Sequence, residues 1–382
     1  MQKGFIIGEV RGVKITADVS WFVFLLLSLY FLAAVLFPSL SVAREWGGGL
    51  QFAAALVVTL LFFLSVLAHE LGHALVIRAA GLPVRGIMLY SFGGATLTDA
   101  EPKHPGEEFR IAAVGPLVSL LLSALFFGAA LLLGLDHTDP APVCAWLLAI
   151  LNFSMGAFNL LPGAPLDGGK VLHAAAWQLT GNPARADRIA AQGGQALGLL
   201  VIALGIAMLV LTGDFFIGLF TIYIGWSMSR QSWRAYREAV SRRLLHSTAA
   251  ADAMMPAAQQ IPPNHTLTEA LDQFVVGRLS VESQVPLPVG EGGNPVGLIA
   301  PAAMSKLPAE ERSHKTVREL MEPIGRLVSV PPDLKLFEVL LRMEAASASH
   351  AVVTNDGLNL GLISRESIAY YLVGMIRSPS AK

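Results

Sequence analysis

The sequence predicts a polytopic α-helical membrane protein with about six transmembrane helices and a short re-entrant β-hairpin, followed by a soluble α/β domain. The 382-residue chain is 54% hydrophobic and only 14% charged, with a mean hydropathy of +0.57, which is far from the composition of a typical soluble protein. Its apolar residues concentrate before Gln231, whereas prolines and polar residues increase from about Thr248. A net charge of −1 gives no reason to expect nucleic-acid binding.

Six apolar stretches are candidates for crossing the bilayer. The hydrocarbon core is about 30 Å thick, so a spanning helix needs roughly 20 predominantly apolar residues. The candidate spans are residues 21–37, 50–79, 109–135, 143–161, 195–211 and 215–228. The last two are short for a bilayer. Before the first span, residues 4–18 alternate enough to suggest a short strand.

Basic residues in the short loops predict the orientation, because cytoplasmic loops carry an excess of lysine and arginine. Such residues precede the first span, separate the second from the third and the fourth from the fifth, and follow the sixth. The other short loops carry Asp136, Asp139 and Asp214, with Arg44 as their only basic residue. We therefore expect a multi-pass protein of the cell membrane with both termini in the cytoplasm.

The second span contains the sequence His69-Glu70-Leu-Gly-His73. Residues four apart lie on one face of a helix, so the two imidazoles can bind one zinc ion while Glu70 lies beside a water that it can deprotonate. Zinc lowers the pKa of such a water toward neutrality. Ionisable groups within a membrane are costly unless they face a protein interior or a water-filled cavity, which favours a functional site here.

Asp167 is the best candidate for a third zinc ligand, because zinc sites need at least three protein ligands. It lies in Asn159-Leu-Leu-Pro-Gly-Ala-Pro-Leu-Asp167-Gly-Gly, where the fourth apolar stretch ends. A helix broken by prolines and glycines can turn a carboxylate into the bundle interior, where membranes tolerate irregular backbone only around a cavity. Taken alone, the Pro-Leu-Asp-Gly-Gly segment is a common turn, but its pairing with the histidine motif favours a ligand.

The two motifs together resemble those of the site-2 protease family of intramembrane zinc metalloproteases. The matching positions are His69, Glu70, His73, Asn159, Pro162, Asp167 and Gly168, and the resemblance covers about residues 8–228. It implies one Zn²⁺ per chain, held by His69, His73 and Asp167, with Glu70 as the general base. It also implies that Asn159 lies near the substrate backbone or the developing oxyanion.

Residues 84–98 carry β-formers on both sides of Gly93-Gly94 and predict a hairpin or re-entrant loop beside the zinc helix. The family resemblance implies that this segment holds the substrate as an extended strand, with Phe92, Gly93 and Gly94 as substrate-binding residues. An ordinary connecting hairpin is the alternative. Gly115-Pro116 is interpreted as a helix-packing notch.

The tail contains an internal repeat, in which Ala253-Met-Met-Pro followed by Ile261-Pro-Pro recurs as Leu320-Met-Glu-Pro followed by Val330-Pro-Pro. This resembles a tandem CBS pair at about residues 248–310 and 314–376. The pair would form a cytoplasmic domain of residues 244–382 after a transmembrane protease domain of residues 1–243. Such pairs commonly bind adenine nucleotides and often associate, so nucleotide binding and a homodimer are open expectations.

The nucleotide expectation is weakened because the family pattern Gly-x-x-Ser/Thr-x-x-Asp has lost its aspartate in both copies, at Ala303 and Ser367. A degenerate module that serves dimerisation or substrate gating is the alternative.

The sequence therefore predicts a zinc-dependent intramembrane endopeptidase that cleaves single-pass membrane substrates and is a candidate for regulation by the CBS pair. The resemblance implies substrates such as a membrane-tethered anti-sigma factor or a signal peptide remnant. The alternative is a CBS-regulated membrane transporter or a zinc-binding scaffold without proteolytic activity. A transporter would spread polar residues through several spans, whereas the mid-membrane ionisable groups here are almost confined to His69, Glu70 and His73.

Overall fold

The computed structural model describes two compact units of the chain, Met1–Tyr236 and Arg237–Lys382. The residues described are 4–91, 93–98, 101–134, 139–256, 260–275, 287–291, 294–323, 327–356 and 358–377. The domain boundary predicted after residue 243 falls inside the long helix α8 (Phe215–Ser247).

Five helical segments of the N-terminal unit are long and apolar enough to cross a membrane. They are Val19–Ser39, which comprises α1 (Val19–Phe31), η1 (Leu32–Leu36) and α2 (Phe37–Ser39), then α3 (Gly48–Ala79), α4 (Pro105–Leu132), α5 (Pro140–Asn159) and α7 (Pro183–Thr212). Many of their apolar side chains are exposed at the surface of the unit, as expected where helices meet lipid. The protein is a polytopic helical membrane protein.

The sixth predicted span, residues 215–228, is not among these five segments. It forms the apolar first part of α8, which continues as a helix through Arg230, Arg234 and Arg237. Its 14 residues, counted from 215 through 228, rise by only about 21 Å, short of the roughly 30 Å of a bilayer core. The apolar run is thus too short to count as a span by itself.

Glycines nevertheless bring α8 against α7. A Cβ built on Gly198 of α7 would lie 2.7 Å from the carbonyl oxygen of Gly225 on α8, and one on Gly225 would lie 2.5 Å from the carbonyl oxygen of Gly198. Only residues without a side chain permit so close an approach of two helices, which is a common way of packing helices in membranes.

A four-stranded sheet lies beside α3 in the order β1-β2-β3-β4. Its strands are β1 (Phe5–Val10), β2 (Val13–Ala17), β3 (Gly86–Tyr90) and β4 (Gly93–Leu97). Strands β2 and β3 pair in parallel, and the other two pairs are antiparallel. The hairpin expected at residues 84–98 is therefore β3 and β4, and β4 is an edge strand among the residues described.

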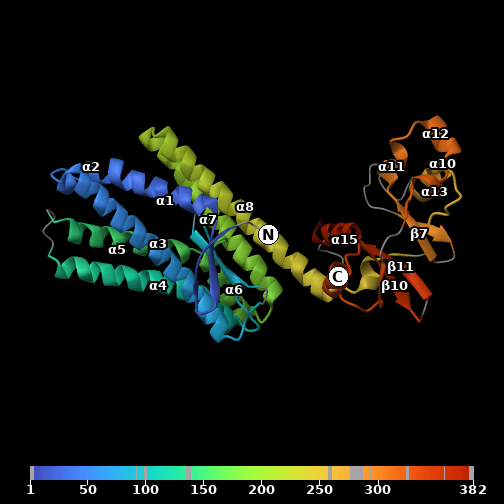
Figure 1. Ribbon diagram of the computed structural model, residues 1–382, viewed down its shortest axis with the longest axis horizontal. Coiled ribbons are helices and arrows are strands. Elements are labelled where there is room, and N and C mark those ends of the chain that lie inside the picture. The colour runs from blue at the N-terminus through green and yellow to red at the C-terminus, as the bar shows by residue number, and fades with distance from the viewer. Residues whose placement is uncertain are drawn as a thin grey trace. The chain divides into compact units, whose positions relative to one another are not determined.

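The helices that surround the site pack closely. Helix α4 contacts α3, α5 and α6 (Asp167–Thr180), and Figure 1 shows α3, α4 and α5 running side by side. The inner face of the sheet adds Val13, Ile15, Ile87 and Leu89, which form a buried cluster with Ala74 of α3. The second half of α3 is thus enclosed by α4, α6 and the sheet.

The C-terminal unit contains two sheets. One has the order β5-β11-β10-β9 and the other the order β6-β7-β8. The strands are β5 (Met255–Pro256), β6 (Leu287–Glu291), β7 (Asn294–Ile299), β8 (Glu322–Pro323), β9 (Leu327–Val330), β10 (His350–Asn355) and β11 (Leu358–Ser364). The helices are α9 (Ala250–Ala253), α10 (Leu267–Ala270), which continues into η4 (Leu271–Val275), α11 (Pro301–Ser305), α12 (Ala309–His314), α13 (Val317–Leu320), α14 (Leu336–Ala345) and α15 (Arg365–Arg377).

The two sequence repeats of this unit exchange short strands. Pro256 of the first repeat pairs with Gly361 in the sheet of the second, and Pro323 of the second pairs with Gly297 in the sheet of the first. A Cβ on either glycine would collide with a methionine of the crossing segment. The repeats therefore form one interlocked α/β unit.

Candidate metal centre

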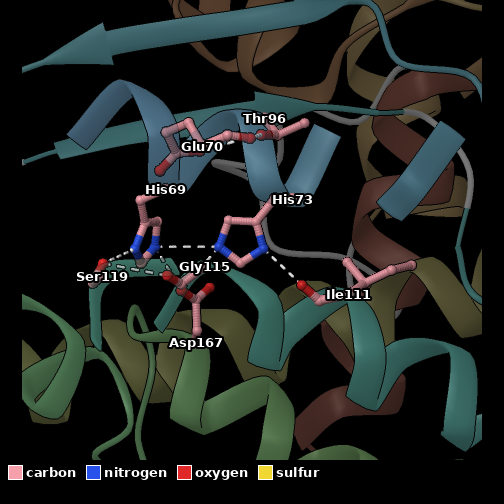
Figure 2. A network of polar contacts seen from close by, with 8 residues as sticks. All are labelled: His69, Glu70, His73, Thr96, Ile111, Gly115, Ser119 and Asp167. Carbon is pink, nitrogen blue, oxygen red and sulfur yellow. Dashed lines mark hydrogen bonds and ion pairs between the residues drawn. The ribbon is translucent and has the colours of Figure 1, made fainter. Parts of the chain in front are cut away.

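Three side chains from two helices converge in the N-terminal unit. Oδ2 of Asp167, at the start of α6, lies 3.1 Å from Nε2 of both His69 and His73 on α3, and the two Nε2 atoms lie 3.3 Å apart. All three residues are buried. Figure 2 shows the two imidazoles and the carboxylate turned toward one another. Two imidazole nitrogens and one carboxylate oxygen that face a common point are a donor set that zinc accepts in catalytic sites.

The two imidazoles are fixed from behind by α4. Nδ1 of His73 lies 2.7 Å from the carbonyl oxygen of Ile111 and therefore carries the proton that it donates, because a carbonyl can only accept. Nδ1 of His69 lies 2.8 Å from the hydroxyl oxygen of Ser119, whose own hydrogen is directed at the carbonyl of Gly115, 3.2 Å away. Both Nε2 atoms are thus left as lone-pair donors, the arrangement that metal-binding histidines adopt.

Helix α4 also approaches the imidazoles without any side chain at Gly115. A Cβ built there would lie 2.5 Å from Nε2 of His69 and closer still to Nε2 of His73. The space directly in front of the donor nitrogens therefore exists because residue 115 is glycine. The sequence interpretation of Gly115-Pro116 as a helix-packing notch missed this role, and the position of a glycine inside an apolar helix was the only available signal.

Tight packing behind Asp167 explains the glycines that follow it. A Cβ on Gly168 would collide with the carbonyl oxygens of Leu160 and Leu161, and one on Gly169 would lie 2.8 Å from the carbonyl carbon of Gly163. The loop after α5 thus folds directly onto the first turn of α6. This contact sets where α6 begins and so directs the Asp167 carboxylate toward α3.

Glu70 follows His69 on α3 and is buried, and its side chain contacts strand β4. The hydroxyl of Thr96 donates toward Oε2 of Glu70 at 3.2 Å and toward the Glu70 carbonyl oxygen at 3.1 Å. A Cβ on Gly94 would lie 2.5 Å from Cγ of Glu70, so β4 packs directly on this side chain. The prediction that Glu70 acts as a general base toward a water at the site concerns a carboxylate whose position is set by this strand.

Comparison with known proteins identifies the family. The model of peptidase family M50 matches residues 57–139 and 139–202. A candidate zinc metalloprotease of Synechocystis sp. is 33% identical over 376 residues, which is 96% of this chain and 95% of the relative. The chain belongs to peptidase family M50, the site-2 proteases. The candidate zinc metalloprotease Rip3 of Mycobacterium tuberculosis is 34% identical over 80% of this chain and 77% of its own length. A zinc metalloprotease of Methanocaldococcus jannaschii is 28% identical over 82% and 84%.

Membership of M50 confirms the predicted enzyme class, a metalloendopeptidase with several membrane-spanning helices, and sets the non-enzymatic alternative aside. The histidine motif lies in the first matched region, and Asn159 and Asp167 lie in the second. A CBS-domain model also matches residues 317–374, within the second predicted module. The predicted roles of individual site residues stay predictions.

The remaining predicted site residues are placed less directly. Asn159 is the last residue of α5 and is half-buried. Gly93 opens β4 with a positive φ of 137°, a conformation that favours glycine. Phe92 lies outside the described residues.

His173 of α6 joins neither the metal donors nor Glu70. Its Nδ1 lies 2.8 Å from Oε2 of Glu108 on α4, and its Nε2 lies 3.1 Å from Oδ1 of Asp187 on α7. Burial lowers the pKa of His173, but the hydrogen bonds with Asp187 and Glu108 outweigh it and raise the pKa to about 10. The imidazolium therefore ties α6 to both neighbouring helices.

Proposed function

We propose that this protein is a zinc-dependent endopeptidase that cuts the transmembrane segment of single-pass membrane proteins near the cytoplasmic face. The proposal rests on the convergence of Asp167, at the start of α6, with His69 and His73 of α3, a helix long and apolar enough to cross the membrane that also carries Glu70. One Zn²⁺ per chain would be held by these two histidines and the aspartate. When bound, it would polarise the scissile carbonyl as a Lewis acid and make the attacking water more acidic.

Glu70 would carry out both proton transfers, and neighbouring residues would position the reacting groups. Glu70 takes the proton of the attacking water and passes it to the leaving amine, the role that a positioned carboxylate serves in acid-base catalysis. Ser119 and the Ile111 carbonyl keep the two imidazoles in the tautomer that leaves Nε2 free. Asn159 donates to the substrate backbone or to the developing oxyanion.

Strand β4 is the proposed binding site for the substrate. A helix resists cleavage because its carbonyls are hydrogen-bonded and covered, so the substrate must unwind before water reaches it. An unwound segment needs new partners for its main chain within a membrane. The edge position of β4 and its contact with Glu70 support binding of the extended segment along Gly93–Leu97 by strand addition.

Substrate identity and regulation extend the same proposal. Single-pass regulatory precursors, such as a membrane-tethered anti-sigma factor or a signal peptide remnant, fit the requirement for one helix that can unwind. With α8 as the sixth crossing that the sequence predicts, both termini would face the cytoplasm, and the CBS pair would act on the side where cleavage occurs. Gly297 and Gly361 open the two segments that correspond to the nucleotide-binding pattern. In this chain they let the exchanged strands β8 and β5 pack closely against β7 and β11. This packing favours dimerisation or gating over adenine nucleotide binding.

The test is reconstitution of the full chain in liposomes with a single-pass reporter that carries a different tag at each end. Mass spectrometry of the products should place the cut within the transmembrane segment, on the half next to the cytoplasmic loops, and Glu70→Gln should abolish it. Cleavage confined to residues outside the membrane, or equal cleavage by Glu70→Gln, would contradict the proposal. Reporters with glycine introduced at the cut site should be cleaved faster, because their helices unwind at lower cost.

A further inference from the structure

The side chain of Glu70 is held from a strand rather than from its own helix. Of the contacts that the structure gives the Glu70 carboxylate, the side-chain hydrogen bond comes from Thr96 of β4, with Oγ1 3.2 Å from Oε2. The same hydroxyl lies 3.1 Å from the main-chain carbonyl of Glu70. A threonine has one hydroxyl hydrogen, so it is shared between these two acceptors. Figure 2 shows Thr96 directly against Glu70.

Alternate residues of β4 form this contact. Side chains point to opposite faces of a strand with a period of two, so Gly94 and Thr96 share one face. A Cβ on Gly94 would lie 2.5 Å from Cγ and 2.9 Å from Cδ of Glu70. Gly94 thus confines the stem of Glu70 while Thr96 holds one carboxylate oxygen.

The register of β4 fixes this face. Thr96 is opposite Ile87 and Gly94 is opposite Leu89 in the antiparallel pair with β3, and both of these partners are buried against α3. Strand β4 is therefore anchored by β3 on one edge, and its other edge ends the sheet. The strand whose free edge would receive the substrate also determines the orientation of Glu70.

We propose that Thr96 is a positioning residue that holds the Glu70 carboxylate in the orientation needed for proton transfer. The inference rests on the proposed function, because it concerns the base of that same site. The Thr96 side chain contacts Glu70, whereas the proposed strand addition pairs the substrate with the main chain of β4, so a substitution of this side chain leaves both the main-chain pairing and the three metal donors in place. Its loss should therefore lower kcat while zinc content and KM stay near their wild-type values.

The substitution Thr96→Val removes the hydroxyl at nearly constant shape. A misplacement of a reacting group by about 1 Å can cost roughly 100-fold in rate, so we expect kcat to fall by about 10- to 100-fold. Thr96→Ser keeps the hydroxyl and should restore kcat to within about threefold of wild type. Thr98→Val is the matched control, because the Thr98 hydroxyl donates to the Pro83 carbonyl and should affect kcat little.

The experiment measures kcat, KM and zinc content of the full-length variants with the single-pass reporter. The inference is overturned if Thr96→Val cleaves at the wild-type rate, if Thr96→Ser is as slow as Thr96→Val, or if either variant loses zinc in parallel with activity. Glu70→Gln in the same series separates the two proposals. Wild-type cleavage by Thr96→Val with an inactive Glu70→Gln removes this inference alone, whereas an active Glu70→Gln removes the proposed function.

Discussion

Replacing Gly115 with alanine tests the geometry of the metal centre most severely among single substitutions in α4. The added Cβ would lie 2.5 Å from Nε2 of His69 and 2.7 Å from Cε1 of His73, whereas ordinary contacts are 3.4 Å or longer. Nε2 of His73 would lie closer still, so the imidazoles or α4 must move by at least about 0.9 Å, the difference between 2.5 Å and 3.4 Å.

Such movements exceed what a zinc site accepts. Metal–ligand distances hold within about 0.2 Å of their ideal values, and even the loss of a partner behind a ligand costs about 10- to 100-fold in affinity. Displacement of the donor atoms themselves should cost more. We therefore expect Gly115→Ala to lower zinc affinity by at least about 100-fold and to abolish cleavage at limiting zinc.

The assay is competition for Zn²⁺ against a chromogenic chelator at fixed pH, with circular dichroism and size-exclusion profiles to check the fold. Gly128→Ala is the matched control on the same helix, because a Cβ there meets nothing within 4 Å. It should bind zinc as the wild type does. Wild-type zinc affinity and cleavage by Gly115→Ala would refute the placement of α4 against the donor nitrogens.

Ser119→Ala removes the partner of His69 and should weaken zinc binding by about 10- to 100-fold in the same chelator competition, and an unchanged affinity would contradict the assigned tautomer. His173→Ala should lower stability by about 2 kcal/mol near pH 6, less than for a fully buried ion pair because water reaches the site. Since the folded-state pKa of His173 is raised to about 10, this contribution is complete below about pH 6.5 and declines toward pH 10. The difference in melting temperature between wild type and variant should shrink over that range, and a constant difference would argue against a charged His173. A chain shortened at the predicted domain boundary should change the cleavage rate or the choice among reporters if the CBS pair regulates access, and identical reporter profiles would argue against such regulation.

The sequence was most informative where chemistry depends on local spacing. His69 and His73 share a helix face because they are four residues apart, and this predicts two donors without any knowledge of the fold. The broken helix end predicted that Asp167 could turn inward, and its pairing with the histidine motif pointed to the third donor. These three side chains do meet in the structure.

The sequence was least informative where contacts join distant segments. Gly115 and Ser119 act on α3 through the packing of α4, and Thr96 acts through the register of β4, so no local pattern indicates any of them. The count of spans also depended on more than apolar content, because the sixth candidate continues into a basic helix. The repeat in the tail was visible, but the exchange of β5 and β8 between its halves was not.

The metal centre is tested most directly by comparing zinc content and reporter cleavage for purified wild type, Glu70→Gln and Asp167→Ala. We expect about one zinc per chain in the wild type and in Glu70→Gln, with cleavage only by the wild type. Asp167→Ala should lose both zinc and cleavage, because two histidines alone leave the ion without its third protein ligand. A wild type that cleaves without zinc, or an Asp167→Ala variant that keeps zinc and full activity, would contradict a catalytic zinc held by His69, His73 and Asp167.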